Sequence, residues 1–260
     1  MKNKTALITG ASSGIGKEFA ILHASKGGDL VIIARNSESL NQLKKELEHR
    51  YKVKVMVIVK DLSLDNAPQE IYDEIKAANI EIDYLINNAG FGGRGEFHVR
   101  TMEQDMQMIA VNIIALTKLT KLFLPDFIQR NSGKILNVSS TAALMPGPLQ
   151  AVYYATKAYV TSLGNAIWQE VKGTNVTITT LMPGAMDTGF AKAADMRNTP
   201  LFSKMVSPVD VAKAGYEGML KGKMNVVAGL TIMQRLFLIL APFAPKKMML
   251  KQIYDMQTEK

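Results

Sequence analysis

A tyrosine and a lysine placed four residues apart, Tyr153 and Lys157, carry the clearest potential for proton transfer in this sequence. Residues at this spacing share one face of a helix, whereas Tyr154 is turned by about 100° and is expected to point elsewhere. A free phenol has a pKa of about 10, and a neighbouring ammonium group lowers that pKa by favouring the phenolate. The pair therefore predicts a group that donates and accepts a proton, although the same spacing also arises by chance on helices.

A glycine-rich turn follows the first predicted strand and reads TGASSGIG over residues 9–16. Glycine lets the backbone turn sharply and approach a pyrophosphate, which then lies at the positive end of the next helix. The spacing is Gly-x-x-x-Gly-x-Gly and not the Gly-x-Gly-x-x-Gly of the common dinucleotide fingerprint. A tight turn with a purely structural role is the alternative. The expected dinucleotide contacts are Gly10, Ser12, Ser13, Gly14, Ile15 and Gly16.

The residue at the end of the second predicted strand is expected to select the cofactor. An acidic residue there bonds the ribose hydroxyls of NAD, whereas an arginine accommodates the 2′-phosphate of NADP. The sequence has Arg35 at this place and no carboxylate before Glu38. A guanidinium offers planar, charge-assisted contacts to phosphate, so we expect NADP(H). The alternative is a solvated arginine at the start of a helix.

Two further turns follow strands and fit a cofactor path. Asp61 and Leu62 end the third strand, where the carboxylate can accept a hydrogen bond from the adenine amino group. Capping of the next helix by this aspartate is the alternative. Asn88, Ala89 and Gly90 end the fourth strand and place small residues beside the cofactor, unless they form an ordinary turn. Both turns are therefore predicted as cofactor contacts.

The elements that must position these residues alternate between short β-branched runs and longer amphipathic stretches. Strands are predicted over residues 5–9, 30–33, 53–59, 84–86, 134–138, 176–181 and 225–227. Helices are predicted over residues 14–26, 37–50, 66–78, 102–130, 153–171 and 209–221. This alternation predicts an α/β fold, with one Rossmann-type domain over residues 1–260. Its sheet is expected to be doubly wound, parallel and seven-stranded, with helices on both faces and ligands beyond the carboxyl ends of the strands.

Composition argues against several other kinds of site. The chain of 260 residues is 47% hydrophobic and 21% charged, which is typical of a globular protein. It has no cysteine, and its three histidines stand apart, so we expect no metal. The net charge of +8 comes from dispersed residues without a basic stripe, so we expect no nucleic-acid partner. No signal peptide is recognised, which makes a cytoplasmic location the expectation.

In their order along the chain, the motifs resemble those of the short-chain dehydrogenase/reductase family. They are TGASSGIG at 9–16, NNAG at 87–90, Asn112, NVSS at 137–140, YYATK at 153–157 and PGAMDT at 183–188. The resemblance extends over residues 4–227. It implies a homodimer or homotetramer in which the helices after Met102 and Tyr153 pack against their symmetry mates.

The resemblance also implies roles for particular residues. Tyr153 is the acid in reduction and the base in oxidation, while Lys157 lowers its pKa and holds the nicotinamide ribose. Ser140 hydrogen-bonds the substrate oxygen, and Asn112, on a kinked helix, connects Lys157 to a proton relay through a water. Donors placed in this way stabilise a developing alkoxide, and the hydride chemistry belongs to the cofactor. The nicotinamide end is expected to meet Gly184, Met186 and Thr188.

The expected function is the NADP(H)-dependent interconversion of a carbonyl and a secondary alcohol by hydride transfer. Ser13 departs from the pattern, because some NADP-dependent members have a basic residue there. A 3-oxoacyl carrier-protein reductase is the alternative enzyme, but its usual Asp-Gly-Gly after the last strand is replaced by Ala228-Gly229-Leu230. A nucleotide-binding scaffold without turnover is the alternative from another class. Against it stand the intact Asn112, Ser140, Tyr153 and Lys157.

Residues 228–260 form an apolar extension that is predicted to lie near the substrate cleft or a subunit interface. Arg235 divides it into apolar runs of about ten residues, and a bilayer span needs about 18. With residues 190–202, the extension is expected to enclose a bulky apolar carbonyl substrate, steroid-like or ketoacyl. The alternatives are a tail that packs only on its own domain or on a second subunit, and weak contact with an anionic membrane surface through Lys246, Lys247 and Lys251. The expected wall includes adaptable thioethers from Met186, Met196, Met205 and Met233.

Overall fold

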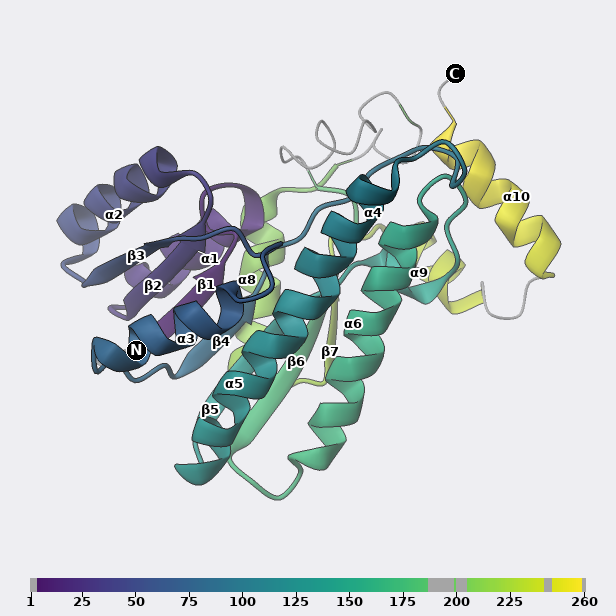
Figure 1. Ribbon diagram of the computed structural model, residues 1–260. Coiled ribbons are helices and arrows are strands. Elements are labelled where there is room, and N and C mark those ends of the chain that lie inside the picture. Colours follow the sequence, from purple (N-terminus) through teal and green to yellow (C-terminus); the bar gives the residue numbers. More distant parts are fainter. Residues whose placement is uncertain (1–3, 187–198, 200–204, 241–244, 259–260) are drawn as a thin grey trace.

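Seven parallel strands form one sheet in the computed structural model, which describes residues 4–186, 199, 205–240 and 245–258. The strand order is β3-β2-β1-β4-β5-β6-β7, which makes the sheet doubly wound, as predicted (Figure 1). The order reverses between β1 and β4, and this is where ligands of such sheets bind. The strands are β1 (Thr5–Thr9), β2 (Asp29–Ala34), β3 (Val55–Val59), β4 (Tyr84–Asn87), β5 (Gly133–Val138), β6 (Val176–Pro183) and β7 (Asn225–Ala228).

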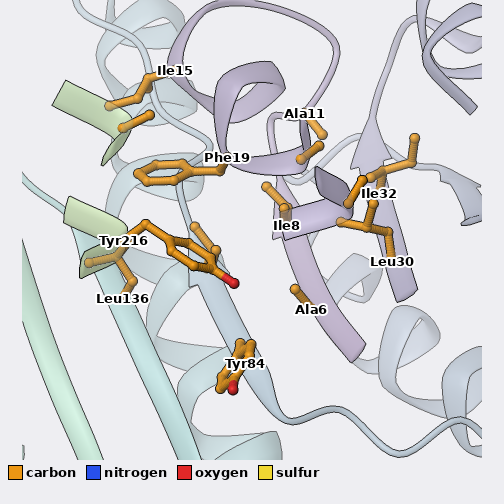
Figure 2. Packing of buried hydrophobic residues seen from close by; sticks show 14 of the residues in the cluster. Ala6, Ile8, Ala11, Ile15, Phe19, Leu30, Ile32, Tyr84, Leu136 and Tyr216 are labelled. Atoms are coloured by element: carbon orange, nitrogen blue, oxygen red, sulfur yellow. The ribbon is translucent and has the colours of Figure 1, made fainter. Parts of the chain in front are cut away.

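Helices cover both faces of this sheet (Figure 1). The first layer contains α1 (Gly14–Ser25), α2 (Ser37–Tyr51) and α8 (Pro208–Leu220). The second layer contains α3 (Ala67–Ala77), α5 (Leu116–Gln129) and α6 (Ala151–Glu170). Each layer packs its apolar stripe against one face of the strands, which explains why the strands are apolar on both sides. Figure 2 shows part of the first layer, with Phe19 and Tyr216 close to the strand residue Ile8.

The predicted long helix over residues 102–130 consists of three parts. These are α4 (Met102–Ile109), the π-helical segment η1 (Ala110–Ala115) and α5. A π-helical turn carries an extra residue and is frequent at functional sites. By length and composition alone the stretch Met102–Gln129 could cross a membrane, but Leu119, Phe123 and Phe127 pack against the sheet. It is therefore a layer of this fold.

Three further helices lie where the sequence predicted none. The short 3-10 helix η2 (Thr141–Leu144) follows β5, and α9 (Ile232–Leu240) and α10 (Lys246–Gln257) form the end of the chain. Met249 and Ile253 of α10 are buried and pack against Met145, which follows η2. The apolar extension thus folds back onto the part of the molecule between β5 and α6 (Figure 1).

A buried histidine joins the first helical layer to the start of the chain. The Nδ1 atom of His23 lies 2.6 Å from the Tyr216 hydroxyl, and Nε2 lies 3.1 Å from the carbonyl oxygen of Lys4. A carbonyl only accepts, so Nε2 carries the hydrogen and Nδ1 accepts from Tyr216. A protonated ring would keep both contacts by donating to each oxygen, so it is burial that lowers the pKa of His23 below its ordinary value of 6.5.

This pair predicts a loss of stability in mild acid. Below pH 6.5 the unfolded chain takes up a proton at His23 that the folded chain resists, so the free energy of unfolding falls as the pH falls. The effect cannot exceed about 1.4 kcal/mol per pH unit for one group. Urea unfolding of the wild type and His23→Gln at about pH 7.5 and 5.5 checks it, because all other titrating groups are shared. The variant should show the shallower pH dependence, and equal slopes would contradict the assignment.

Candidate active site

A cavity of about 820 Å³ lies beyond the carboxyl ends of the strands. It is lined by residues that follow each of the strands β1 to β6. The predicted catalytic residues Ser140, Tyr153 and Lys157 line it, whereas Asn112 does not. Thr188 and residues 190–202, apart from Thr199, lie outside the described residues. The cavity brings together these predicted cofactor contacts: Gly10, Ser12, Ser13, Gly14, Ile15, Gly16, Arg35, Asp61, Leu62, Asn88, Ala89, Gly90, Gly184 and Met186.

The glycine-rich turn has the geometry of a cradle for phosphate. Gly10 and Gly14 have φ values of +67° and +53°, in the left-handed region that favours glycine. A Cβ atom on Gly16 would lie 2.3 Å from the carbonyl oxygen of Gly10, so only glycine fits there. The side chain of Ser13, the residue that precedes α1, makes no capping hydrogen bond within the described part of the chain. The first amides of α1 are therefore available to an anion.

A threonine that the sequence analysis did not assign holds this turn against the next strand. The hydroxyl oxygen of Thr9 accepts from the backbone amides of Asn88 at 3.0 Å and Ala89 at 2.9 Å. In return, the Asn88 side chain donates to the carbonyl oxygens of Thr9 at 2.8 Å and Gly10 at 3.3 Å. The signal that could have revealed Thr9 is its type, because a hydroxyl at the end of a buried strand needs partners.

Arg35 and Asp61 face each other in the part of the cavity that follows β2 and β3. The Arg35 guanidinium is 77% exposed, and its Nη1 atom lies 3.8 Å from Oδ2 of Asp61. Burial raises the pKa of Asp61, but hydrogen bonds from the Ser63 amide and hydroxyl, together with the charge of Arg35, outweigh burial and lower it overall. Asp61 therefore caps the turn at Ser63 and not the next helix, α3, which Asn66 precedes. Arg35 remains open to a phosphate.

The predicted proton-transfer group lies in the wall formed by α6 and the residues at the end of β5. Tyr153 and Lys157 are buried on one face of α6, and the Lys157 Nζ atom lies 5.9 Å from the centroid of the Tyr153 ring. Nζ donates to the carbonyl oxygen of Val138 at 3.0 Å. The Ser140 side chain hydrogen-bonds Tyr153 and also accepts from the amide of Ala142 at 3.1 Å. A hydroxyl that follows β5 thus hydrogen-bonds the phenol at the cavity.

Burial dominates the protonation of this pair. It raises the pKa of Tyr153 to about 12, against a smaller lowering by the Ser140 hydrogen bond, and lowers the pKa of Lys157 to about 8. In the free protein burial outweighs any lowering of this pKa by Lys157, and the role of Lys157 stays a prediction. The physical reason is that both groups lose their hydration in the same wall, and desolvation disfavours the charged form of each. Tyr153 is therefore a protonated phenol at neutral pH.

Asn112 occupies the π-helical segment η1 and acts behind the cavity wall. Its side chain donates to the carbonyl oxygen of Phe91 at 2.9 Å and to the Thr156 hydroxyl at 3.1 Å, and accepts from the Phe91 amide at 3.1 Å. A Cβ atom on Gly90 would lie 3.0 Å from Asn112 Oδ1 and 3.2 Å from Lys157 Nζ. Asn112 therefore positions the loop after β4 beside Lys157.

Tyr154 lies in the same wall, so the expectation that it points elsewhere is wrong. It lines the cavity, and its ring packs edge-on against Tyr153 with centroids 6.1 Å apart. Its hydroxyl accepts from the side-chain nitrogen of Gln257 at 3.3 Å, so α10 ends against this tyrosine. Both rings belong to one apolar cluster at the start of α6.

The expected methionine wall is largely wrong. Met186 lines the cavity, but Met205 and Met233 do not and are 42% and 73% exposed. Met196 lies outside the described residues. Apolar side chains from other elements instead pack around the two tyrosines, namely Phe91, Met108, Ala142, Met145 and Val152.

Comparison with known proteins agrees with this geometry. A family profile described as short chain dehydrogenase matches residues 4–198. The very-long-chain 3-oxoacyl-CoA reductase of Mus musculus is 34% identical over 193 residues, which is 72% of this chain and 61% of that protein. The chain thus matches less than two thirds of the length of this relative.

Two solved structures share the fold at higher coverage. A short-chain dehydrogenase from Sphingobium yanoikuyae in complex with NADPH has a TM-score of 0.83 and 28% identity, and covers 92% of this chain and 93% of its own. A bulky-bulky ketone specific alcohol dehydrogenase from Comamonas testosteroni has a TM-score of 0.80 and 26% identity. The match covers 94% of this chain and 93% of that protein. With the matched motifs and the parallel sheet in place, this chain belongs to the short chain dehydrogenase family.

Proposed function

We propose that the protein is an NADP(H)-dependent oxidoreductase that interconverts a carbonyl and a secondary alcohol. The observation that carries the proposal is that one cavity holds both the glycine cradle and the Ser140–Tyr153–Lys157 group. A nucleotide-binding scaffold would need the cradle but not a buried phenol hydrogen-bonded to a serine. The intact group therefore favours turnover over a role in binding alone.

In this proposal the wall of β5 and α6 manages the proton. Ser140 and Tyr153 donate hydrogen bonds to the carbonyl oxygen of the substrate, and Tyr153 gives its proton to the alkoxide that forms there. When bound, the nicotinamide supplies the hydride. Lys157, held by the carbonyl oxygen of Val138, places a positive charge behind the phenol and stabilises the phenolate that remains. In the reverse direction Tyr153 accepts the proton of the alcohol.

Support for NADP(H) comes from the end of β2. Arg35 lines the cavity and is exposed, and its nearest anionic partner in the described structure, Asp61, lies at the edge of ion-pair distance. Exposed pairs of this kind contribute little, so the guanidinium is free to bind a phosphate. The solved relative from Sphingobium yanoikuyae is in complex with NADPH, which agrees with this choice.

We propose a bulky, mostly apolar substrate, with a 3-oxoacyl group as the preferred class. The curated relative reduces a very-long-chain 3-oxoacyl-CoA, and the structural relative is specific for bulky-bulky ketones. In this chain, Phe91 lines the cavity next to Tyr153 and Tyr154, within an apolar cluster. The C-terminal helix α10 packs against this cluster through Met145, which supports a covered substrate end.

Arg35→Asp should reverse the cofactor preference. A charge-assisted hydrogen bond to phosphate contributes about 1.5–3 kcal/mol, or about ten- to a hundredfold in affinity, and the new carboxylate adds repulsion. Fluorescence titration with NADPH and NADH measures both dissociation constants. Arg50→Asp makes the same charge change at the far end of α2 and should leave the preference intact. A wild type that binds both cofactors equally would contradict the assignment.

Tyr153→Phe should remove turnover and keep cofactor affinity. The variant retains the buried ring but cannot deliver a proton to the alkoxide, so kcat should fall by about a hundred- to ten-thousandfold. The test follows the loss of NADPH absorbance with a panel of ketones. Tyr159→Phe, which removes an exposed hydroxyl from the same helix, serves as the control. Near-normal kcat in the Tyr153 variant would rule out the proposed acid.

We also propose a two-fold assembly through the outer faces of α4 to α6. Met102, Met106, Ile114 and Tyr159 expose apolar surface there, and closed two-fold contacts are the commonest way to cover it. Light scattering should give the mass of a dimer or tetramer at micromolar concentration, and a monomer would contradict the proposal. The cytoplasmic location and a weak membrane contact through the exposed Lys246, Lys247 and Lys251 stay predictions.

A further inference from the structure

The cavity wall contains a buried amide that the proposed mechanism does not use. Gln150 lines the cavity directly before α6 and is only 3% exposed. Its backbone is fully engaged, because its amide donates to the carbonyl oxygen of Gly147 at 3.1 Å and its carbonyl oxygen accepts from the amide of Tyr154 at 3.0 Å. Its side-chain nitrogen, Nε2, is covered from solvent but has no hydrogen-bond partner within the described residues.

An amide nitrogen in this state is costly and therefore informative. A buried donor without a partner costs about 1–3 kcal/mol, and native proteins contain few of them. Helix capping does not offset this cost, because the Gln150 side chain makes no capping hydrogen bond to α6. The terminal torsion of glutamine has a broad energy profile, so the amide can turn towards a ligand without a change in the backbone.

The other side-chain amides that line the cavity are those of Asn36, which is exposed, Asn88 and Gln107, and the buried, unpartnered nitrogen of Asn137 does not line it. The side-chain nitrogen of Asn88 donates to the carbonyl oxygen of Thr9 at 2.8 Å. That of Gln107 donates to the Glu103 carboxylate at 3.2 Å, and Gln107 is exposed. Gln150 is therefore the buried amide of this wall that a ligand can engage without breaking an existing hydrogen bond.

The position of Gln150 defines which ligand atom it can meet. It is the N-cap residue of α6, three residues before Tyr153, and both residues line the cavity. Tyr153 and Ser140 take the oxygen of the reacting carbonyl, and a second acceptor close to that carbonyl comes within reach of Gln150. A 3-oxoacyl thioester has such an acceptor, because its thioester carbonyl is separated from the reacting carbonyl by one carbon.

We infer that Gln150 determines specificity by donating a hydrogen bond to the second carbonyl of a 1,3-dicarbonyl substrate, such as a 3-oxoacyl thioester. The inference rests on the proposed function and deepens it, because it separates 3-oxoacyl substrates from plain ketones. Plain ketones of the same size fit the apolar wall around Phe91 and Met145 but leave the Gln150 amide unpaired. A site built to hydrogen-bond a substrate group discriminates against an analogue that lacks it.

The test compares two substrates in two proteins. One substrate is an alkyl 3-oxoester, and the other is the ketone of the same length in which methylenes replace the ester carbonyl and ester oxygen. In Gln150→Met, a substitution of similar volume, kcat/KM for the 3-oxoester should fall by about tenfold, while that for the plain ketone should change by less than about twofold. Gln129→Met, on the exposed end of α5, controls for the change of side-chain type.

Two further readouts make the result decisive. The affinity for NADPH should be unchanged in Gln150→Met, and the Tm of the ligand-free protein should be unchanged or higher, since an unpaired donor has been removed. An equal loss on both substrates, no loss on the 3-oxoester, or a Tm lowered by several degrees would overturn the inference. A wild type that reduces neither substrate with NADPH would instead reject the proposed function, and the inference with it.

Discussion

The burial of Tyr153 and Lys157 in one wall is the constraint on which the rest of the site depends. Desolvation keeps the phenol protonated, with a pKa of about 12, and lowers the pKa of the lysine to about 8. An ammonium group can stay charged in such a place only if it has a hydrogen-bond partner, and the carbonyl oxygen of Val138 provides one. The wall therefore holds a proton donor ready and a positive charge close behind it.

Hydrogen bonds from neighbouring elements hold this wall in place. The hydroxyl of Ser139 donates to the carbonyl oxygen of Lys157 at 2.8 Å, which joins β5 to α6. Asn112, on the π-helical segment, binds the backbone of Phe91 and the Thr156 hydroxyl, which joins the loop after β4 to the same helix. The C-terminal helix reaches the wall through Gln257 and Tyr154. Loss of any of these contacts would therefore shift the position of the Tyr153 phenol, because packed or hydrogen-bonded neighbours connect them to it.

Much of this arrangement could be predicted from the sequence, because the strands are short β-branched runs and the motifs follow them directly. The seven strands and the gathering of Gly10, Asn88, Ser140 and Tyr153 at one edge of the sheet follow from that pattern. The π-helical segment was not predictable, since a single inserted residue leaves the apolar period almost unchanged. The rise in the pKa of Tyr153 was not predictable, because sequence spacing reports the nearby charge but not the loss of water. The packing of α10 against Met145 was not predictable either, because it depends on tertiary contacts alone.

The most direct test of this account is a spectroscopic titration of the phenol itself. The phenolate absorbance of the wild type minus that of Tyr153→Phe isolates Tyr153, because all other tyrosines are shared by the two proteins. In the ligand-free protein the difference should stay flat between about pH 7 and pH 10, since burial keeps Tyr153 protonated over that range. An additional phenolate with a midpoint below about pH 9 would contradict the account, because a nearby charge, and not burial, would then control the protonation of Tyr153.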